Sequence, residues 1–235
     1  MSVYSSSLTL QNRDVDLFRR LRLSRLFELM QEASICHTEA LGAGRAVTLD
    51  RGLLWVVTLQ HCRISRLPEY DEHITLETWP GETLHVLFPR QYRILDASGA
   101  PIISACAIWT LVDAATRRVA FPESVGVHID GISTPGDMPL PHALGAYSGE
   151  NVREFTVPYS YVDLNGHMNN TRYFDLADDI LPAARAGRVP REIYAEYREE
   201  LRLDARVRLT WGGDADALCL TGGADKPAFR LRFLY

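Results

Sequence analysis

The chain has 235 residues, of which 46% are hydrophobic and 23% are charged, and its formal net charge at pH 7 is −5. This composition is typical of a globular protein, and the length allows one large domain or two small ones. A general nucleic-acid-binding protein would carry a basic excess, so the charge argues against that class. No apolar run approaches the roughly 20 residues that cross a bilayer, which argues against membrane insertion.

The cysteines are scattered, with no C-x-x-C pair and no histidine at metal-ligand spacing: Cys36, Cys62, Cys106 and Cys219. We therefore expect free thiols in a reducing compartment, with neither a metal nor a cofactor. Residues 1–14 lack the basic segment and the apolar segment of a secretory signal. The sequence thus predicts a cytoplasmic protein.

The first half of the chain predicts a strand, a helix and then four further strands. Residues 5–11 are strand-like, and Ser24 is placed to cap the helix that follows. The apolar positions of that helix share one face: Leu26, Leu29, Met30 and Ala33. Runs rich in β-branched and aromatic residues, bounded by turn signals, then predict strands over 52–64, 73–79, 85–95 and 101–113.

The same order of elements starts again after a segment rich in proline, glycine and serine, at 131–150. A strand is predicted over 153–161, and a second amphipathic helix ends near Pro182. Its apolar positions are Tyr173, Leu176, Ala177, Ile180 and Leu181. Four strands follow, over 192–201, 206–211, 217–223 and 228–235. We therefore expect an N-terminal unit over 1–130, a linker over 131–150 and a C-terminal unit over 151–235.

An internal repeat supports this division. With a shift of 147 residues, "VDLFRRLRLSRLFELMQE" aligns with "VDLNGHMNNTRYFDLADD" at six identical positions in eighteen, where chance pairing would give about one. The matching order of strands and helix on either side supports the repeat independently. The sequence therefore predicts an α+β chain made of two copies of one unit, each a helix packed on an antiparallel sheet.

The two copies differ in the loop before the helix. The second copy has Asn165 and His167, where the first has Phe18 and Arg20. An apolar ring and a permanent cation cannot replace a neutral amide and a titratable base. We therefore expect the first copy to bind or support the substrate and the second copy to carry out the chemistry.

The loop and helix of the second copy resemble a motif of the acyl–acyl carrier protein (acyl-ACP) thioesterases. "VDLNGHMNNTRYFDL" fits the pattern Asp-x-Asn-x-His-x-Asn-Asn-x-x-Tyr, and "EYREEL" resembles the segment Tyr-Arg-Arg-Glu-Cys, which places Glu200 on the catalytic glutamate of that family. The segments "ITLETWP" and "QYRILDASGAPIISACAIWTLVDAATRRVAFP" resemble its N-terminal domain. The resemblance implies two tandem hotdog units, each with a long helix wrapped by an antiparallel sheet.

Two positions depart from the family pattern. Leu201 stands where plant members have a cysteine, so a Cys–His mechanism is unavailable at that position, and Glu199 replaces the second arginine. The absence of a plastid transit peptide suggests a bacterial-type member.

The resemblance implies an acyl-[acyl-carrier-protein] hydrolase that releases free fatty acid and so ends fatty acid elongation. The candidate catalytic residues are Asp163, Asn165, His167 and Glu200. Glu200, assisted by His167, would activate water. Asn165 and the backbone amides at the helix start, near 169–171, would stabilise the oxyanion, and Asp163 would orient its neighbours. A competing mechanism makes Asp163 the nucleophile, through an acyl anhydride.

Simpler interpretations stay open for single residues. Asp163 could only cap a turn, as the matching Asp16 could in the other copy. His167 could be a surface histidine with its hydrogen bonds satisfied, Asn169 and Asn170 could be structural helix-cap residues, and Glu200 could be an ordinary solvated strand residue.

The partner implied by the resemblance is an acidic acyl carrier protein with a phosphopantetheine-linked acyl chain. Clusters of arginine, such as Arg206 and Arg208, could form a docking strip for it. The alternative functions are a hotdog thioesterase acting on acyl-coenzyme A and a non-catalytic acyl-binding hotdog protein. A monomer and a homodimer are both feasible, and nothing in the pattern selects an acyl chain length.

Overall fold

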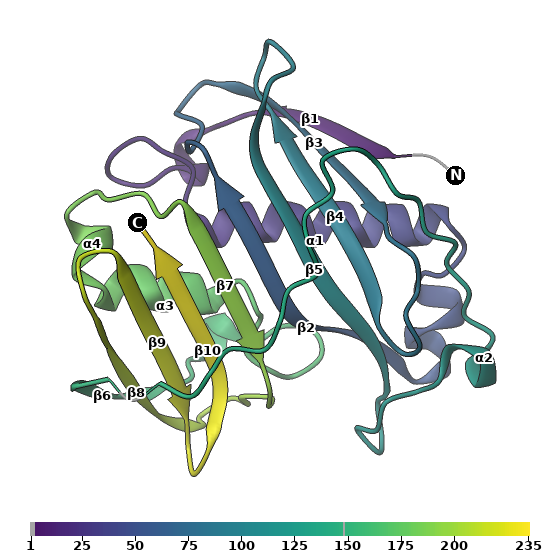
Figure 1. Cartoon of the computed structure of the whole chain (residues 1–235). Helices are drawn as coiled ribbons and strands as arrows, with labels where there is room; N and C mark the ends of the chain where they lie inside the picture. The colour runs from purple at the N-terminus through teal and green to yellow at the C-terminus, as the bar shows by residue number, and fades with distance from the viewer. Residues whose placement is uncertain (1–2, 148) are drawn as a thin grey trace.

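One curved antiparallel sheet forms the centre of the protein, as the computed structural model of residues 3–147 and 149–235 shows (Figure 1). In the described residues it has ten strands, in the order β1-β3-β4-β5-β2-β7-β10-β9-β8-β6. The strands of the N-terminal unit are β1 (Tyr4–Thr9), β2 (Leu53–Ile64), β3 (His73–Pro80), β4 (Phe88–Leu95) and β5 (Pro101–Asp113). Those of the C-terminal unit are β6 (Asn151–Thr156), β7 (Glu192–Tyr197), β8 (Arg206–Gly213), β9 (Ala217–Gly223) and β10 (Pro227–Leu234).

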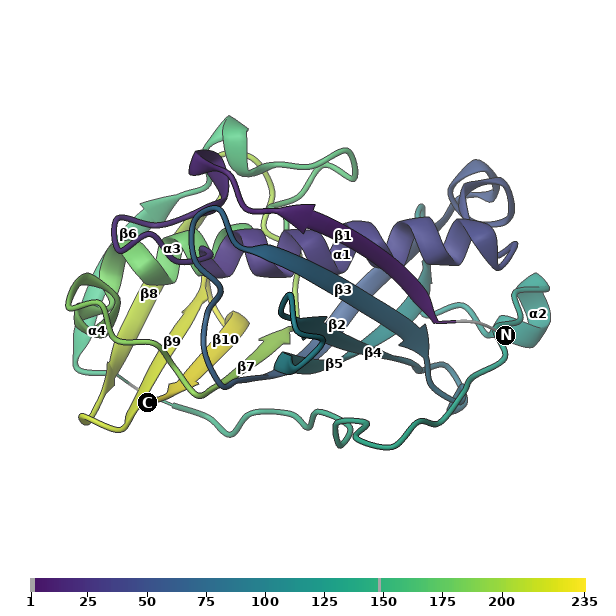
Figure 2. The same ribbon diagram turned by 90° about the horizontal axis from the view of Figure 1, so that it is seen from above.

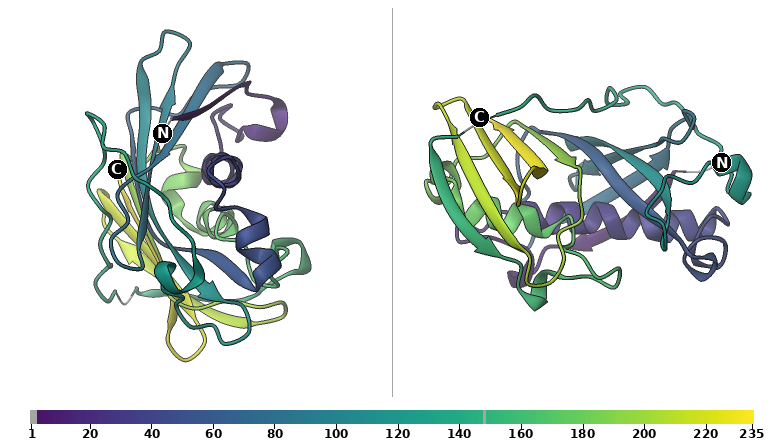
Figure 3. Two further views of the ribbon diagram at one scale, coloured as in Figure 1. Left: turned by 90° about the vertical axis from the view of Figure 1, so that its right-hand side faces the viewer. Right: turned by 90° about the horizontal axis from the view of Figure 1, so that it is seen from below.

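The two main helices, α1 (Leu23–Ala40) and α3 (Arg172–Ile180), lie on the same face of this sheet (Figure 2). The other α-helices of the described residues are α2 (Pro122–Val125) and α4 (Pro182–Arg185). Short 3-10 helices cover Asn12–Asp14, Arg45–Val47, Leu49–Arg51 and Tyr159–Tyr161. The described residues between α2 and β6 form no strand or helix and cross the opposite face of the sheet (Figure 3).

Each helix buries its apolar stripe against the sheet. In α1 the predicted positions Leu26, Met30 and Ala33 are buried, while Leu29 is partly exposed. The predicted cap is wrong, because the N-cap lies two residues earlier than Ser24: α1 begins at Leu23, and Ser24 lies buried inside the helix. Arg22 takes the N-cap position, where its backbone N–H donates to the Asp14 carbonyl at 3.0 Å.

The two units share their core and their sheet. Strands β2 and β7 pair in register from Leu59↔Glu196 to Arg63↔Glu192, so one sheet continues from one unit into the other. On the helical side, Phe27 of α1 stacks on Phe174 of α3, with ring centroids 3.8 Å apart and ring planes 6° from parallel. These two residues match each other in the 147-residue repeat. A contact between matching residues is what an approximate two-fold axis between the two copies produces.

Candidate functional site

The loops before the two main helices have matching backbone conformations. In the first copy the Asp16 N–H donates to the Arg20 carbonyl at 2.7 Å, and in the second the Asp163 N–H donates to the His167 carbonyl at 2.9 Å. Both loops turn through a left-handed residue, Arg19 (φ 63°) and Gly166 (φ 82°) respectively. The duplicated backbone therefore presents two different sets of side chains.

Asp163 holds this loop together, and both of its carboxylate oxygens are used. Oδ1 accepts the backbone N–H of Asn165 at 2.8 Å, and Oδ2 accepts the side-chain amide of Asn169 at 3.4 Å. In the first copy, Asp16 accepts the N–H of Phe18 at 2.8 Å in the same way. The turn-capping role is thus present in both copies, and the contact with the Asn169 amide is an additional interaction of Asp163.

The asparagines after His167 shape the start of α3. Asn169 Oδ1 accepts both the backbone N–H of Thr171, at 2.9 Å, and its hydroxyl, at 2.8 Å. The Asn169 N–H donates to the Tyr161 carbonyl at 2.8 Å. Two of the three backbone amides expected to face an oxyanion are therefore already used. Of the three, only the Asn170 N–H has no partner among the described residues, and the buried Nδ2 of the same side chain also has none.

His167 and Glu200 lie side by side. Nε2 of His167 is 3.3 Å from Oε1 of Glu200, although the pair lacks the alignment of a hydrogen bond. The prediction that Glu200 lies on a strand is wrong, because β7 ends at Tyr197 and Glu200 follows in the connection to β8. The strand ends where the N–H groups of Arg198 and Glu199 both donate to the Ala228 carbonyl, at 2.7 and 3.1 Å.

Burial governs the charge of His167, whose side chain is 13% exposed. Loss of solvation lowers the pKa of His167 below its ordinary value, and the Glu200 and Asp163 carboxylates oppose that effect only in part. The imidazole is therefore neutral at neutral pH, with ring nitrogens that can accept or donate a proton.

Asn165 completes the set of predicted residues. It is half-buried, and its side-chain amide has no hydrogen-bond partner among the residues that the structure describes. The structure therefore brings His167 and Glu200 together and ties Asp163 to the backbone of Asn165, while the Asn165 amide stays available for a ligand.

Arg117, which the sequence places only among the arginine clusters available for carrier docking, lies next to Glu200. Its Nη1 is 3.2 Å from Glu200 Oε1, and Arg202 Nη2 is 3.8 Å from Oε2. Arg117 belongs to the N-terminal unit, in the turn after β5. In the sequence Arg117 is only one of two adjacent arginines. Its contact with Glu200 depends on how the two units pack, which the sequence pattern does not show.

The first copy has a cavity of about 270 Å³ at the corresponding place, lined among others by Asp16, Phe18, Arg20 and Leu67. Matching backbone hydrogen bonds show that Leu67 corresponds to Glu200. In the first copy the Leu21 N–H donates to the carbonyl of Pro68, the residue after Leu67, at 2.8 Å. In the second copy the Met168 N–H donates to the carbonyl of Leu201, the residue after Glu200, at 2.7 Å. The four counterparts thus include neither an imidazole nor a glutamate, so a histidine–glutamate pair is present at this place only in the second copy.

Asp178 lines the same cavity and gives a testable pH effect. Burial, together with the nearby carboxylates of Asp175, Asp16 and Asp179, raises the pKa of Asp178 to about 7. Between about pH 4 and 7 the folded protein then binds more protons than the unfolded chain, so its stability falls as pH rises. We expect Asp178→Asn to stabilise the protein by about 1–2 kcal/mol at pH 8, allowing for partial exposure.

Urea unfolding at pH 4 and pH 8 measures this effect. The difference in the free energy of unfolding between the variant and the wild type should be small at pH 4 and should grow as the pH rises to 8. Asp179→Asn is the matched control, since that side chain is exposed. An equal stability difference at both pH values would contradict the assignment.

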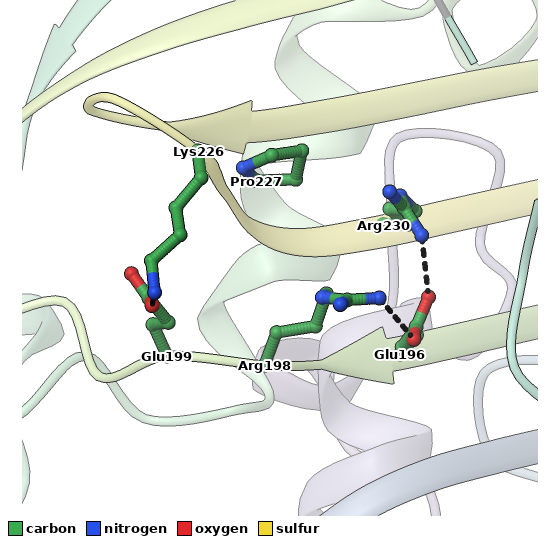
Figure 4. Close-up of a pocket in the computed structure, with 6 residues that line it drawn as sticks. All are labelled: Glu196, Arg198, Glu199, Lys226, Pro227 and Arg230. Carbon is green, nitrogen blue, oxygen red and sulfur yellow. Dashed lines mark hydrogen bonds and ion pairs between the residues drawn. The ribbon is translucent and has the colours of Figure 1, made fainter. Parts of the chain in front are cut away.

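A larger cavity, about 420 Å³, lies against β7 and β10 (Figure 4). Its charged groups pair with one another: Glu196 accepts from Arg198 at 3.0 Å and from Arg230 at 3.2 Å, and Lys226 pairs with Glu199. The Glu196 carboxylate also accepts the backbone N–H of Leu144 in the linker at 3.3 Å. We assign these ion pairs a structural role, which is to hold the linker on the sheet.

Across 3–147 and 149–235 there is no group of three or more histidine, cysteine, aspartate or glutamate side chains that could hold a metal ion. No helix in the described part of the chain is both long enough and apolar enough to span a membrane.

Two tandem units, each a helix packed on an antiparallel sheet, define the class of double-hotdog proteins. Residues 1–124 match the family model of the acyl-ACP thioesterase N-terminal domain, and residues 146–219 match that of the C-terminal domain. The chain therefore belongs to the acyl-ACP thioesterase family, as its motif predicts.

Plant enzymes are among the similar sequences. An acyl-[acyl-carrier-protein] hydrolase of Cuphea viscosissima, described as chloroplastic, is 27% identical over 86% of this chain and 53% of its own length. A palmitoyl-acyl carrier protein thioesterase of Arabidopsis thaliana, also chloroplastic, is 23% identical over 86% of this chain and 53% of its own length. The chain thus spans about half the length of these relatives.

Solved structures show the same fold. An acyl-ACP thioesterase from Bacteroides thetaiotaomicron aligns with a TM-score of 0.87 at 19% identity, over 99% of this chain and 97% of its own. A 12:0-ACP thioesterase from Umbellularia californica aligns with a TM-score of 0.83 at 18% identity, over 99% and 96%. The predicted α+β fold of two tandem hotdog units is confirmed.

Proposed function

We propose that this protein hydrolyses acyl-ACP and releases the free fatty acid, which would end elongation of that chain. The observation that carries the proposal is the pairing of His167 with Glu200, 3.3 Å apart, in the second copy only. Membership of the acyl-ACP thioesterase family supports the substrate class.

In the proposed reaction, Glu200 acts as the general base. Its carboxylate takes a proton from water, and the resulting hydroxide attacks the thioester carbonyl carbon. The carbon–sulfur bond then breaks, the proton passes to the thiolate of the phosphopantetheine arm, and the fatty acid leaves. The neutral imidazole of His167 is close enough to orient the water or to relay the proton.

The negative charge that develops on the carbonyl oxygen needs hydrogen-bond donors. The side-chain amide of Asn165 is available, and so are the backbone N–H and the side-chain amide of Asn170. Each such donor contributes about 3–4 kcal/mol in enzymes with a preformed oxyanion site. Together with the base, these donors account for a typical enzymatic acceleration.

Direct attack by water is favoured over an acyl-enzyme on Asp163. Both oxygens of the Asp163 carboxylate accept hydrogen bonds from its own loop, at 2.8 and 3.4 Å, which suits an orienting role. A single turnover in ¹⁸O-labelled water distinguishes the two routes. Direct water attack places the label in the fatty acid in every turnover. An anhydride on Asp163 instead places it in the Asp163 carboxylate whenever water attacks the aspartyl carbonyl carbon, and the fatty acid then leaves with the original aspartate oxygen.

A comparison of acyl thioesters tests the proposal. Fatty acyl chains of several lengths, presented on acyl carrier protein and on coenzyme A, should be hydrolysed with the higher kcat/KM for the carrier-bound form. A preference for coenzyme A would indicate an acyl-CoA thioesterase instead. Tight binding of fatty acid with no turnover of any thioester would indicate a non-catalytic acyl-binding protein.

A further inference from the structure

The carboxylate of Glu200 is contacted from both units. Its Oε1 lies 3.2 Å from Nη1 of Arg117 in the N-terminal unit and 3.3 Å from Nε2 of His167 in the C-terminal unit. Its Oε2 has one charged neighbour, Arg202 Nη2 at 3.8 Å, and the side chain of Arg202 is 69% exposed. The two oxygens therefore have different environments.

A tight turn fixes the direction of Arg117. Oδ1 of Asp113, the last residue of β5, accepts the N–H groups of Ala115 and Thr116, at 3.1 and 2.7 Å, and the Thr116 hydroxyl at 2.8 Å. The Arg117 N–H then donates to the Asp113 carbonyl at 2.8 Å. This leaves Arg117 in the left-handed conformation, at φ 58°, which glycine adopts most readily. The hydrogen bonds of the turn hold an arginine in that conformation.

We propose that Arg117 is a positioning residue that the N-terminal unit contributes to the reaction of the C-terminal unit. By holding Oε1 beside His167, Arg117 leaves Oε2, whose charged neighbour is the exposed Arg202, as the atom that accepts the proton from water. This inference rests on the proposed function, and it assigns a role in the reaction to the first copy.

The substitution Arg117→Gln tests the inference, with Arg118→Gln as the matched control. Arg118 is the exposed neighbour in the same turn and forms no ion pair within the described part of the chain. The substrate is an acyl N-acetylcysteamine thioester, which carries no protein and so excludes an effect on carrier docking. Thermal unfolding of each variant shows whether the fold is retained.

We expect Arg117→Gln to lower kcat by about 10-fold with little change in KM, since a displaced base acts on a normally bound substrate. If Arg117 only supported the fold, kcat normalised to the folded fraction would be unchanged. Arg117→Lys should restore part of kcat, because an ammonium keeps the positive charge beside Oε1 but lacks the planar geometry of a guanidinium. Arg118→Gln should match the wild type.

Three outcomes would overturn the inference. The first is an unchanged kcat in Arg117→Gln once activity is normalised to folded protein, including the case where the protein is merely less stable, since that indicates a structural residue. The second is a defect seen with acyl-ACP and absent with the small thioester, which indicates docking. In both cases an active wild type leaves the proposed function intact. The third is a wild type that hydrolyses neither substrate, which removes the proposed function as well.

Discussion

Replacement of Glu200 by glutamine is expected to lower kcat/KM for acyl-ACP by about 10²–10⁴-fold, the usual contribution of a positioned general base. That range corresponds to about 3–5 kcal/mol of transition-state stabilisation. Glutamine keeps the shape of the side chain but cannot accept a proton from water. His167→Ala should lower activity by a comparable factor, since the two side chains are 3.3 Å apart.

The matched control for this experiment is Glu199→Gln. Glu199 is the neighbouring carboxylate, and it pairs with Lys226 at the other side of the connection. Its replacement should leave kcat/KM within a few-fold of the wild type. Equal losses in the two variants would point to a general effect of charge. Full activity in Glu200→Gln would remove Glu200 from the mechanism.

The pH dependence of the wild type checks the state of His167 in the same assay. Because burial lowers the pKa of His167, its imidazole stays neutral to a lower pH than that of an exposed histidine. Activity should therefore hold from neutral pH to below about pH 6.5, the ordinary pKa of histidine, before it falls. A mechanism that needs the imidazolium would instead lose activity as the pH rises toward neutrality.

Truncation of Phe174 to alanine is expected to destabilise the protein by about 3–5 kcal/mol, the usual cost of removing a fully buried aromatic ring. Phe174 and Phe27 are 0% and 1% exposed, and their rings stack 3.8 Å apart. The contact joins α3 to α1, so the loss should lower the stability of both units together. Urea unfolding followed by circular dichroism measures it.

A double-mutant cycle separates the energy of ring stacking from the energy of burying each ring. Phe27→Ala should cost a similar amount, and the double variant should cost less than the sum, by about 0.5–1.5 kcal/mol for the aromatic pair. Phe121→Ala is the control, because that ring is 60% exposed, and its removal should change stability by no more than about 0.5 kcal/mol. Strict additivity of the two core substitutions would show that the stack itself contributes nothing.

The local sequence pattern was enough to predict the helices and strands whose formation depends mainly on residues nearby in the chain. The apolar spacing in α1 and α3 and the strand-like runs identified both units, and the motif from Asp163 to His167 located the loop that the structure places beside Glu200. The repeat found by shifting the sequence was confirmed by matching hydrogen bonds in the two loops.

The predictions that failed depend on contacts between distant segments. Glu200 leaves its strand because two successive N–H groups turn to the carbonyl of Ala228 in β10. Arg117 reaches Glu200 only through the pairing of β2 with β5 and with β7, which sets the two units side by side. Ser24 lies inside α1 because the chain before it is held by Asp14. None of these contacts leaves a periodic signal.

The covalent link between the two halves has a consequence for how such a protein can evolve. In a pair of identical subunits, every mutation appears twice, so a change that suits one side of the assembly is imposed on the other. Here Leu67 and Glu200 occupy equivalent places and are encoded separately. Each half is thus free to specialise, and a lineage can change the features that hold the acyl chain without altering the residues that cleave it.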